Sequence, residues 1–214
     1  MKAIGIVTIL FIIIISGSVY LISREKTSDS EAGIVKEEKK SCCSSDMGSD
    51  AVSDNSIYLL ESEWKNEDGT ALNIKSLKNS NVVLGLIFAN CSYACPIIVN
   101  DMKRIESSLS KNELKETRFV LVSIDHERDT PEKLKEFGSR MGLDLKRWDL
   151  LAGSESDIRE LAALLGFKYK KDDTGNYSHS NMITLLDKNG EIMYQHEGLN
   201  EDIAEVTDQI KHLN

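Results

Sequence analysis

Two cysteines and a distant histidine are the residues that could together form a reactive or metal-binding site. Cys91 and Cys95 are separated by three residues, Pro96 follows directly, and His179 lies much later in the chain. A thiolate is both a nucleophile and a soft metal ligand, and a neutral imidazole is a common metal ligand. These residues could therefore exchange disulfides, or they could bind one metal ion through two sulfurs and a nitrogen.

The segment around the cysteines predicts a junction between a strand and a helix. Residues 82–88 (VVLGLIF) form an apolar run with the length of a strand that is buried on both faces. Pro96 suits the first helical position, which places Cys95 at the N-cap; if the helix instead begins at Cys91, the sulfurs lie four residues apart on one face. Either geometry brings the sulfurs together, and the helix N-terminus is expected to favour a thiolate at Cys95.

The pattern after residue 53 is typical of an α/β domain over residues 54–214. A second apolar run at residues 119–124 predicts another central strand, and residues 130–132 (TPE) predict the start of a helix. Because strand, helix, strand and helix alternate, the sheet is expected to be largely parallel, with functional groups at its carboxyl edge.

The last part of the domain completes a thioredoxin-like order of elements. A helix is expected after Ser154, ending near Gly166, and residues 182–194 predict a hairpin around an Asp-Lys-Asn-Gly turn. Apolar residues at helical spacing predict a final helix over residues 202–213. In a thioredoxin-like fold, this topology carries His179 toward the cysteines.

Metal binding is favoured over dithiol chemistry by two features of the pattern. Thioredoxin-like oxidoreductases resemble one another in a proline just before the strand that faces the cysteines, but here His179 stands at that place and the only prolines are Pro96 and Pro131. The three-residue spacer also differs from the CxxC of dithiol oxidoreductases. Two thiolates and one imidazole suit Cu(I), can serve Cu(II) and are acceptable to Zn(II), so the ligand types alone leave the metal open.

Asp125 and His126, at the end of the second predicted central strand, are not predicted to bind the metal. His126, just after the second predicted central strand, is interpreted as an exposed loop residue in preference to an auxiliary ligand. Asp125 could orient His179 or cap the next helix, and the cap is favoured.

The same residues carry a resemblance to a known family. Cys-x-x-x-Cys-Pro after an apolar strand, residues 123–125 (SID) followed by 127–131 (ERDTP), and a histidine just before a strand and an Asp-Lys-Asn-Gly turn resemble the Sco/SenC copper-chaperone family, from about Ile57 to the C-terminus. The resemblance implies a membrane-anchored, thioredoxin-like protein that binds copper through Cys91, Cys95 and His179. It also implies a role in cytochrome c oxidase assembly, with the subunit that carries the dinuclear copper site as partner.

An enzyme is the alternative to this metallochaperone. A membrane-tethered thiol-disulfide oxidoreductase, or a peroxiredoxin-like peroxidase, would use Cys91 or Cys95 as nucleophile, and a copper-responsive signalling module could use the same site. The prediction favours a chaperone that turns over no substrate. In an oxidising compartment the two cysteines are expected to be redox-active, which makes a thiol reductant a second expected partner.

The amino-terminal residues predict a membrane anchor and a tether. Residues 3–22 are apolar and uncharged, and as a helix they would cross a hydrocarbon core of about 30 Å, so residues 1–22 are interpreted as a retained anchor. Residues 23–53 are rich in Ser, Glu, Lys and Asp and predict a flexible tether. Its Cys42 and Cys43 could bind a metal or pair with another chain, and the interpretation that they have no role is slightly favoured. The expected location is a bacterial inner membrane, with a single pass and the domain outside the cytoplasm.

Composition narrows the classes of partner. The chain has 26 Lys and Arg against 35 Asp and Glu, for a net charge of −9. Because phosphate contacts need a basic surface, this balance argues against a nucleic-acid partner.

Overall fold

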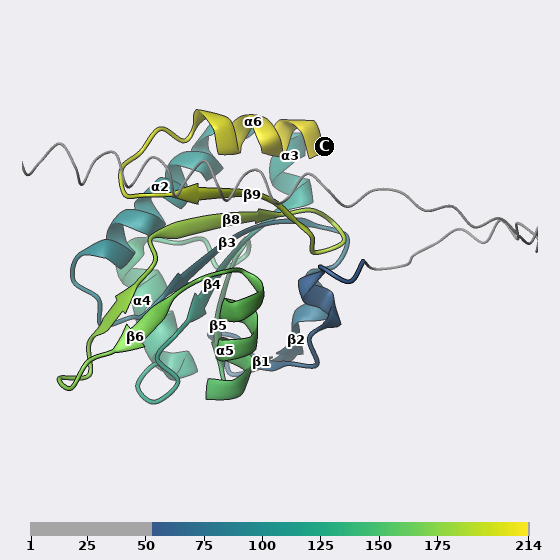
Figure 1. The fold of residues 1–214 in the computed structure, drawn as a ribbon. Coiled ribbons are helices and arrows are strands. Elements are labelled where there is room, and N and C mark those ends of the chain that lie inside the picture. Colours follow the sequence, from purple (N-terminus) through teal and green to yellow (C-terminus); the bar gives the residue numbers. More distant parts are fainter. Residues whose placement is uncertain (1–52, 214) are drawn as a thin grey trace, which may run out of the picture. The chain divides into compact units, whose positions relative to one another are not determined.

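The computed structural model describes residues 53–213 (Figure 1). The predicted anchor at residues 1–22 and the predicted tether, up to its last residue, lie outside this range. No helix between residues 53 and 213 combines the length and apolar composition that crossing a lipid bilayer requires.

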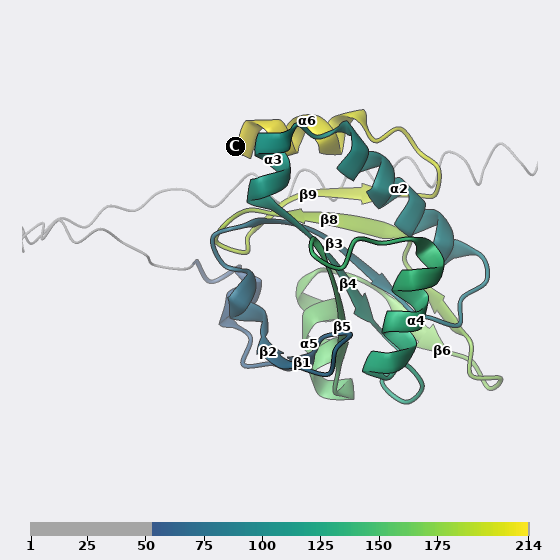
Figure 2. The same cartoon turned by 180° about the vertical axis from the view of Figure 1, so that it is seen from behind.

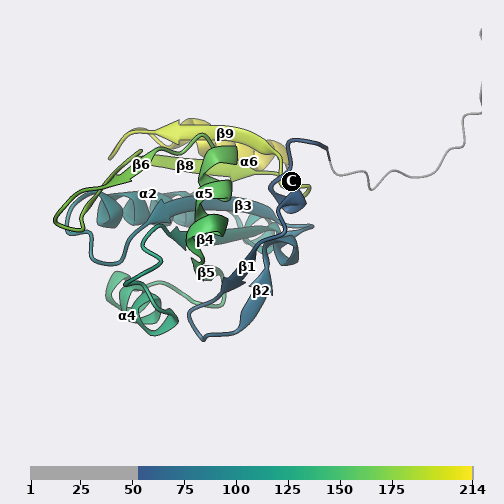
Figure 3. The same cartoon turned by 60° about the horizontal axis from the view of Figure 1, so that its bottom comes forward.

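A seven-stranded sheet in the order β2-β1-β5-β4-β3-β8-β9 forms the centre of the domain. Three parallel strands make its middle: β3 (Asn81–Ile87), β4 (Thr117–Ser123) and β5 (Trp148–Gly153). Antiparallel strands extend both sides: β8 (Met182–Leu186) and β9 (Ile192–Glu197) beyond β3, and β1 (Glu63–Lys65) and β2 (Ala71–Asn73) beyond β5. Figure 3 shows these strands in order, from β9 at the top to β2 near the bottom.

Helices cover both faces of this sheet. They are α2 (Ala94–Ser108), α3 (Lys111–Glu116), α4 (Pro131–Met141), α5 (Glu155–Leu164) and α6 (Ala204–Leu213), with short 3-10 turns at Ile57–Leu59 and Ile74–Leu77. Figures 1 and 2, seen from opposite sides, show α5 on one face and α2 and α4 on the other. A Cβ on Gly85 of β3 would lie 3.0 Å from Met102 Sδ, so this glycine lets α2 pack closely on the strand.

Local sequence signals account for several of these boundaries. The Thr130 side chain accepts the Lys133 N–H at the start of α4, and the Ser154 side chain accepts the Asp157 N–H at the start of α5. Gly166, with φ +68°, follows the end of α5. The two predicted central strands, the hairpin and the thioredoxin-like α/β arrangement are confirmed.

A small second sheet was not anticipated. Strands β6 (Tyr169–Lys171) and β7 (Tyr177–His179) pair antiparallel with each other and are separate from the seven-stranded sheet. Each has three residues, which is too short for an alternation of apolar and polar side chains to be recognised. We call residues 169–179 the histidine hairpin, because β7 ends at His179.

Candidate metal centre

The cysteines lie where β3 passes into α2, but the helix begins earlier than its proline suggests. Its first residue is Ala94 and its N-cap is Tyr93, whose side chain makes no capping hydrogen bond. Cys95 is therefore the second helical residue and Pro96 the third, while Cys91 lies in the preceding loop. Both predicted helix starts were wrong. The first N–H groups of any helix lack an intrahelical partner, so proline is tolerated throughout the first turn and Pro96 does not fix the first helical residue.

The two sulfurs have different surroundings. The Cys95 N–H donates to Cys91 Sγ at 3.4 Å, and the Phe88 N–H donates to Cys95 Sγ at 3.4 Å. Cys95 is fully buried, whereas Cys91 is half-buried. Burial raises the pKa of the Cys95 thiol above its ordinary value, and the hydrogen bond from Phe88 offsets only part of this effect. The expected thiolate at Cys95 is therefore not favoured in the metal-free protein, because desolvation outweighs the helix N-terminus.

The imidazole of His179 turns its Nε2 atom toward the sulfur of Cys95. Its Nδ1 lies 2.8 Å from the Ser180 carbonyl oxygen, and its Nε2 lies 3.8 Å from Cys95 Sγ. A carbonyl can only accept a hydrogen bond, so in the neutral ring the proton is assigned to Nδ1. The lone pair of Nε2 then faces the sulfur, which is the orientation a metal ligand requires.

Aromatic side chains hold this imidazole in place. The Phe167 ring stacks on His179 with a centroid separation of 5.9 Å, and Phe88 meets it edge-on at 5.8 Å. Tyr177 in turn packs against Phe88 at 5.4 Å. We call Phe88, Phe167 and Tyr177 the aromatic frame. It was not predicted from the sequence, although Phe167 and Tyr169, like Tyr177 and His179, show the two-residue spacing of side chains on one face of a strand.

The three side chains are close enough for one metal ion. Cys91 Sγ, Cys95 Sγ and a ring nitrogen of His179 all lie within 4.8 Å of one another. Bonds of about 2.3 Å to sulfur and about 2.0 Å to nitrogen, set at about 120°, separate those two ligand atoms by about 3.7 Å. The observed 3.8 Å between Cys95 Sγ and His179 Nε2 fits a trigonal site without rearrangement of that pair.

Other residues considered from the sequence lie outside this group. His126 is exposed, and its nearest charged neighbour is Glu127 at 4.0 Å, as expected for a loop residue. The predicted capping role of Asp125 was wrong, because Thr130 caps α4. Asp125 is instead fully buried and forms an ion pair with Arg128.

Comparisons with known proteins agree with this fold and site. The SCO1/SenC family model matches residues 58–214. The structure of a SCO1/SenC family lipoprotein from Bacillus anthracis is 29% identical, covers 72% of this chain and 94% of that chain, and has a TM-score of 0.66. The structure of BsSco, a member of the Sco family of cytochrome c oxidase assembly proteins that was studied for a disulfide switch, is 27% identical over 71% of this chain and 90% of that chain, with a TM-score of 0.62.

A third structure shows the same fold at lower sequence similarity. Bradyrhizobium japonicum ScoI, solved with copper bound, is 22% identical, covers 72% of this chain and 97% of that chain, and has a TM-score of 0.58. Because the family model covers well over half of the sequence, this protein belongs to the SCO1/SenC family.

Proposed function

We propose that this protein is a copper metallochaperone that binds the ion through Cys91, Cys95 and His179. The observation that carries this proposal is the convergence of the three ligand atoms within 4.8 Å, with a lone pair of the imidazole facing a sulfur. Two thiolates and one imidazole form a soft ligand set that suits Cu(I). Family membership and the copper-bound relative support copper over zinc.

The exposure of the site suits transfer of the ion to an acceptor. Cys91 is half-buried, and Tyr93 in the same loop is 73% exposed, whereas Cys95 and the rings of Phe88 and Phe167 are buried. An acceptor thiolate can therefore approach from the side of Cys91 and bond to copper before the bond to Cys91 breaks. The ion is cargo, and no substrate is turned over.

The acceptor that we propose is the cytochrome c oxidase subunit that carries the dinuclear copper site. The resemblance to Sco/SenC proteins supports it, as does the description of BsSco as belonging to a family of oxidase assembly proteins. Residues 1–22 would anchor the chain in the bacterial inner membrane and residues 23–53 would tether the domain outside the cytoplasm. The apolar composition of residues 3–22 supports the anchor.

Thiol-disulfide exchange is the second candidate function. The two sulfurs lie within 4.8 Å of each other, and the half-buried Cys91 is accessible to a partner thiol. Exchange with a disulfide of a partner protein would oxidise Cys91 and Cys95 to a disulfide and reduce the partner to two thiols. This would block copper binding until a thiol reductant reopened the bond. This redox step is compatible with the chaperone function and would control loading.

Anaerobic titration of the reduced full-length protein with Cu(I), in detergent and against a competing chelator, tests the metal site. We expect one tightly bound ion per chain, weaker binding in His179→Ala, and loss of that site in Cys91→Ser. Substituting serine for Cys42 and Cys43 in every variant removes competing thiols, and His212→Ala provides a matched control on the exposed face of α6. Unchanged affinity in His179→Ala would remove the histidine from the site.

Zinc competition and a thiol assay separate the alternatives. Zn(II) that displaces Cu(I) at equal concentration would contradict the assignment of copper. Disulfide reductase or peroxidase turnover by the metal-free protein, abolished in Cys91→Ser, would favour the enzyme.

A further inference from the structure

The hairpin that carries His179 is not hydrogen-bonded into the main sheet, so other contacts must hold it beside the cysteines. Within residues 53–213, its two strands pair only with each other. Its turn is closed locally, because Asp172 Oδ1 accepts the N–H groups of Thr174 and Asn176 at 2.9 and 2.8 Å. A hairpin with three-residue strands is marginal by itself, so its position relative to Cys91 and Cys95 depends on tertiary contacts.

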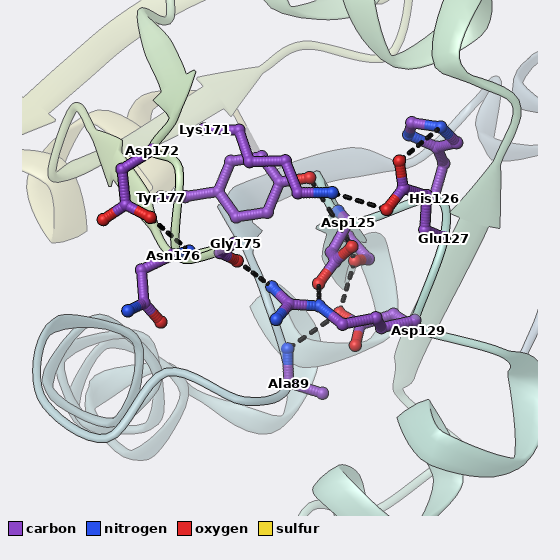
Figure 4. Close-up of polar contacts among 12 residues, drawn as sticks. Ala89, Asp125, His126, Glu127, Asp129, Lys171, Asp172, Gly175, Asn176 and Tyr177 are labelled. Atoms are coloured by element: carbon purple, nitrogen blue, oxygen red, sulfur yellow. Dashed lines mark hydrogen bonds and ion pairs between the residues drawn. The ribbon is translucent and has the colours of Figure 1, made fainter.

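One arginine connects this hairpin to the loop between β4 and α4, which we call the β4–α4 loop (residues 124–130). Arg128 Nη2 donates to the Gly175 carbonyl at the hairpin turn, and Arg128 Nε donates to the Asp125 carboxylate. Gly175 has φ +81°, and a Cβ there would lie 3.4 Å from Arg128 Nη1, so the guanidinium also packs against the turn. Figure 4 shows Asp125, Gly175 and Tyr177 grouped at this junction.

Weaker contacts join the same two segments. The Tyr177 hydroxyl lies 3.5 Å from Asp125 Oδ1, and Lys171 Nζ lies 2.5 Å from Glu127 Oε2. The Lys171 ion pair is solvent-exposed and contributes little by itself, because water and salt screen it. Asp125, by contrast, is fully buried, so water reaches its ion pair with Arg128 only from the side of the arginine, whose side chain is 37% exposed.

The next residue of the loop, Asp129, forms a hydrogen bond to the segment just before Cys91. Asp129 Oδ2 accepts the Ala89 N–H at 2.7 Å and the Ser123 hydroxyl at 2.6 Å. Ala89 lies two residues before Cys91. The loop is braced internally, because the N–H groups of Arg128 and Asp129 both donate to the Asp125 carbonyl, at 3.3 and 3.0 Å. Two adjacent loop residues therefore contact the two segments that carry the ligands: Arg128 contacts the hairpin turn at Gly175, and Asp129 contacts Ala89 (Figure 4).

From this arrangement we propose that Arg128 is a positioning residue, which sets the separation between His179 and the two cysteines by holding the hairpin turn against the β4–α4 loop. Arg128 is not a metal ligand, and its effect on affinity acts through the histidine. The proposal deepens the proposed function, on which its metal readout rests.

Arg128→Lys separates the positioning role from the neutralisation of Asp125. The guanidinium uses Nε for Asp125 and Nη2 for Gly175, whereas one lysine ammonium can neutralise the carboxylate but cannot reproduce this planar two-sided contact. We expect Cu(I) affinity to fall about tenfold, at the low end of the effect of residues that orient metal ligands. Arg118→Lys is the matched control, since Arg118 pairs with Asp149 and its side chain is 41% exposed, against 37% for Arg128.

A double-mutant cycle distinguishes positioning from general destabilisation. In a His179→Ala background, Arg128→Lys should cause no further loss of Cu(I) affinity, because the ligand that it positions is gone. Hydrogen exchange on the metal-free, full-length protein supplies a second readout: amides of residues 169–179 should exchange faster in Arg128→Lys, while those of β3 and β4 stay as in the wild type.

Equal affinity losses in both backgrounds, or hairpin exchange that matches the wild type, would overturn the role of Arg128. If the wild-type protein binds no copper at the three-residue site, the proposed function fails, and the exchange experiment still decides whether Arg128 holds the hairpin.

Discussion

Replacing Asp129 with alanine removes a buried acceptor that joins the loop before the cysteines to β4. Asp129 is 5% exposed, and one of its oxygens accepts from both Ala89 and Ser123. A buried donor that loses its acceptor costs about 1–3 kcal/mol. Ser123 is buried and bears this cost in full, whereas water can reach the half-buried Ala89. We therefore expect the free energy of unfolding to fall by about 2–4 kcal/mol.

Urea unfolding of the reduced, metal-free protein, followed by the fluorescence of the two buried tryptophans, measures this loss. For a domain of this size the melting temperature should fall by about 4–16 °C. Asp68→Ala is the control, because Asp68 forms an exposed ion pair with Lys135 and its loss should cost less than about 1 kcal/mol. A loss in Asp129→Ala no larger than in this control would refute the reasoning.

The stability contributed by Asp129 should also depend on pH with a definite sign. Burial raises the pKa of the Asp129 carboxyl above its ordinary value, although the hydrogen bonds from Ser123 and Ala89 oppose this effect. The native state therefore binds this proton more tightly than the unfolded chain does, so stability is gained as pH falls through the folded pKa and is complete below the unfolded pKa of about 3.9. The unfolding free energy of the wild type minus that of Asp129→Asn should therefore increase as pH falls from about 7 to about 4. A decrease over this range would contradict the sign.

Three further tests address packing and the metal. Gly153→Ala would place a Cβ 2.5 Å from the buried Trp64 ring, and we expect overpacking to cost about 1–3 kcal/mol in chemical denaturation. Phe167→Leu removes the ring stacked on His179 and should reduce the free energy of Cu(I) binding by more than it reduces the free energy of unfolding. A Cu(I) affinity equal to that of the wild type would show that Phe167 does not hold the imidazole in place. Saturation with Cu(I) at about 100 times its dissociation constant should add about 2.7 kcal/mol to the unfolding free energy, and calorimetry should show no such gain in Cys95→Ser.

Local signals in the sequence were sufficient for much of the fold. Residues 82–88 and 119–124 are almost entirely apolar because strands covered on both faces bury nearly every side chain, so their place in the sheet could be predicted. The starts of α4 and α5 were predictable because Thr130 and Ser154 cap the helices that follow them directly. The spacing of Cys91 and Cys95 after an apolar strand likewise identified the segment that supplies the two sulfur ligands of the candidate metal site.

Other features depend on residues far apart in the chain and could not be predicted. The pKa of Cys95 is raised by burial, and burial is a property of the packed domain. The ion pair of Arg128 with Asp125 is local in sequence, but its contact with Gly175 requires the histidine hairpin to fold back onto the β4–α4 loop.

The sequence by itself determined which side chains could bind a metal and which strands form the middle of the sheet, because residue type and hydrophobic periodicity are properties of short segments. The tertiary structure decided the distance between His179 and the sulfurs, which nitrogen of the ring faces them, and which residues hold the hairpin in place. These are relations between segments that only the packed domain brings together, such as the contact between Cys95 and His179, which lie 84 residues apart in the chain.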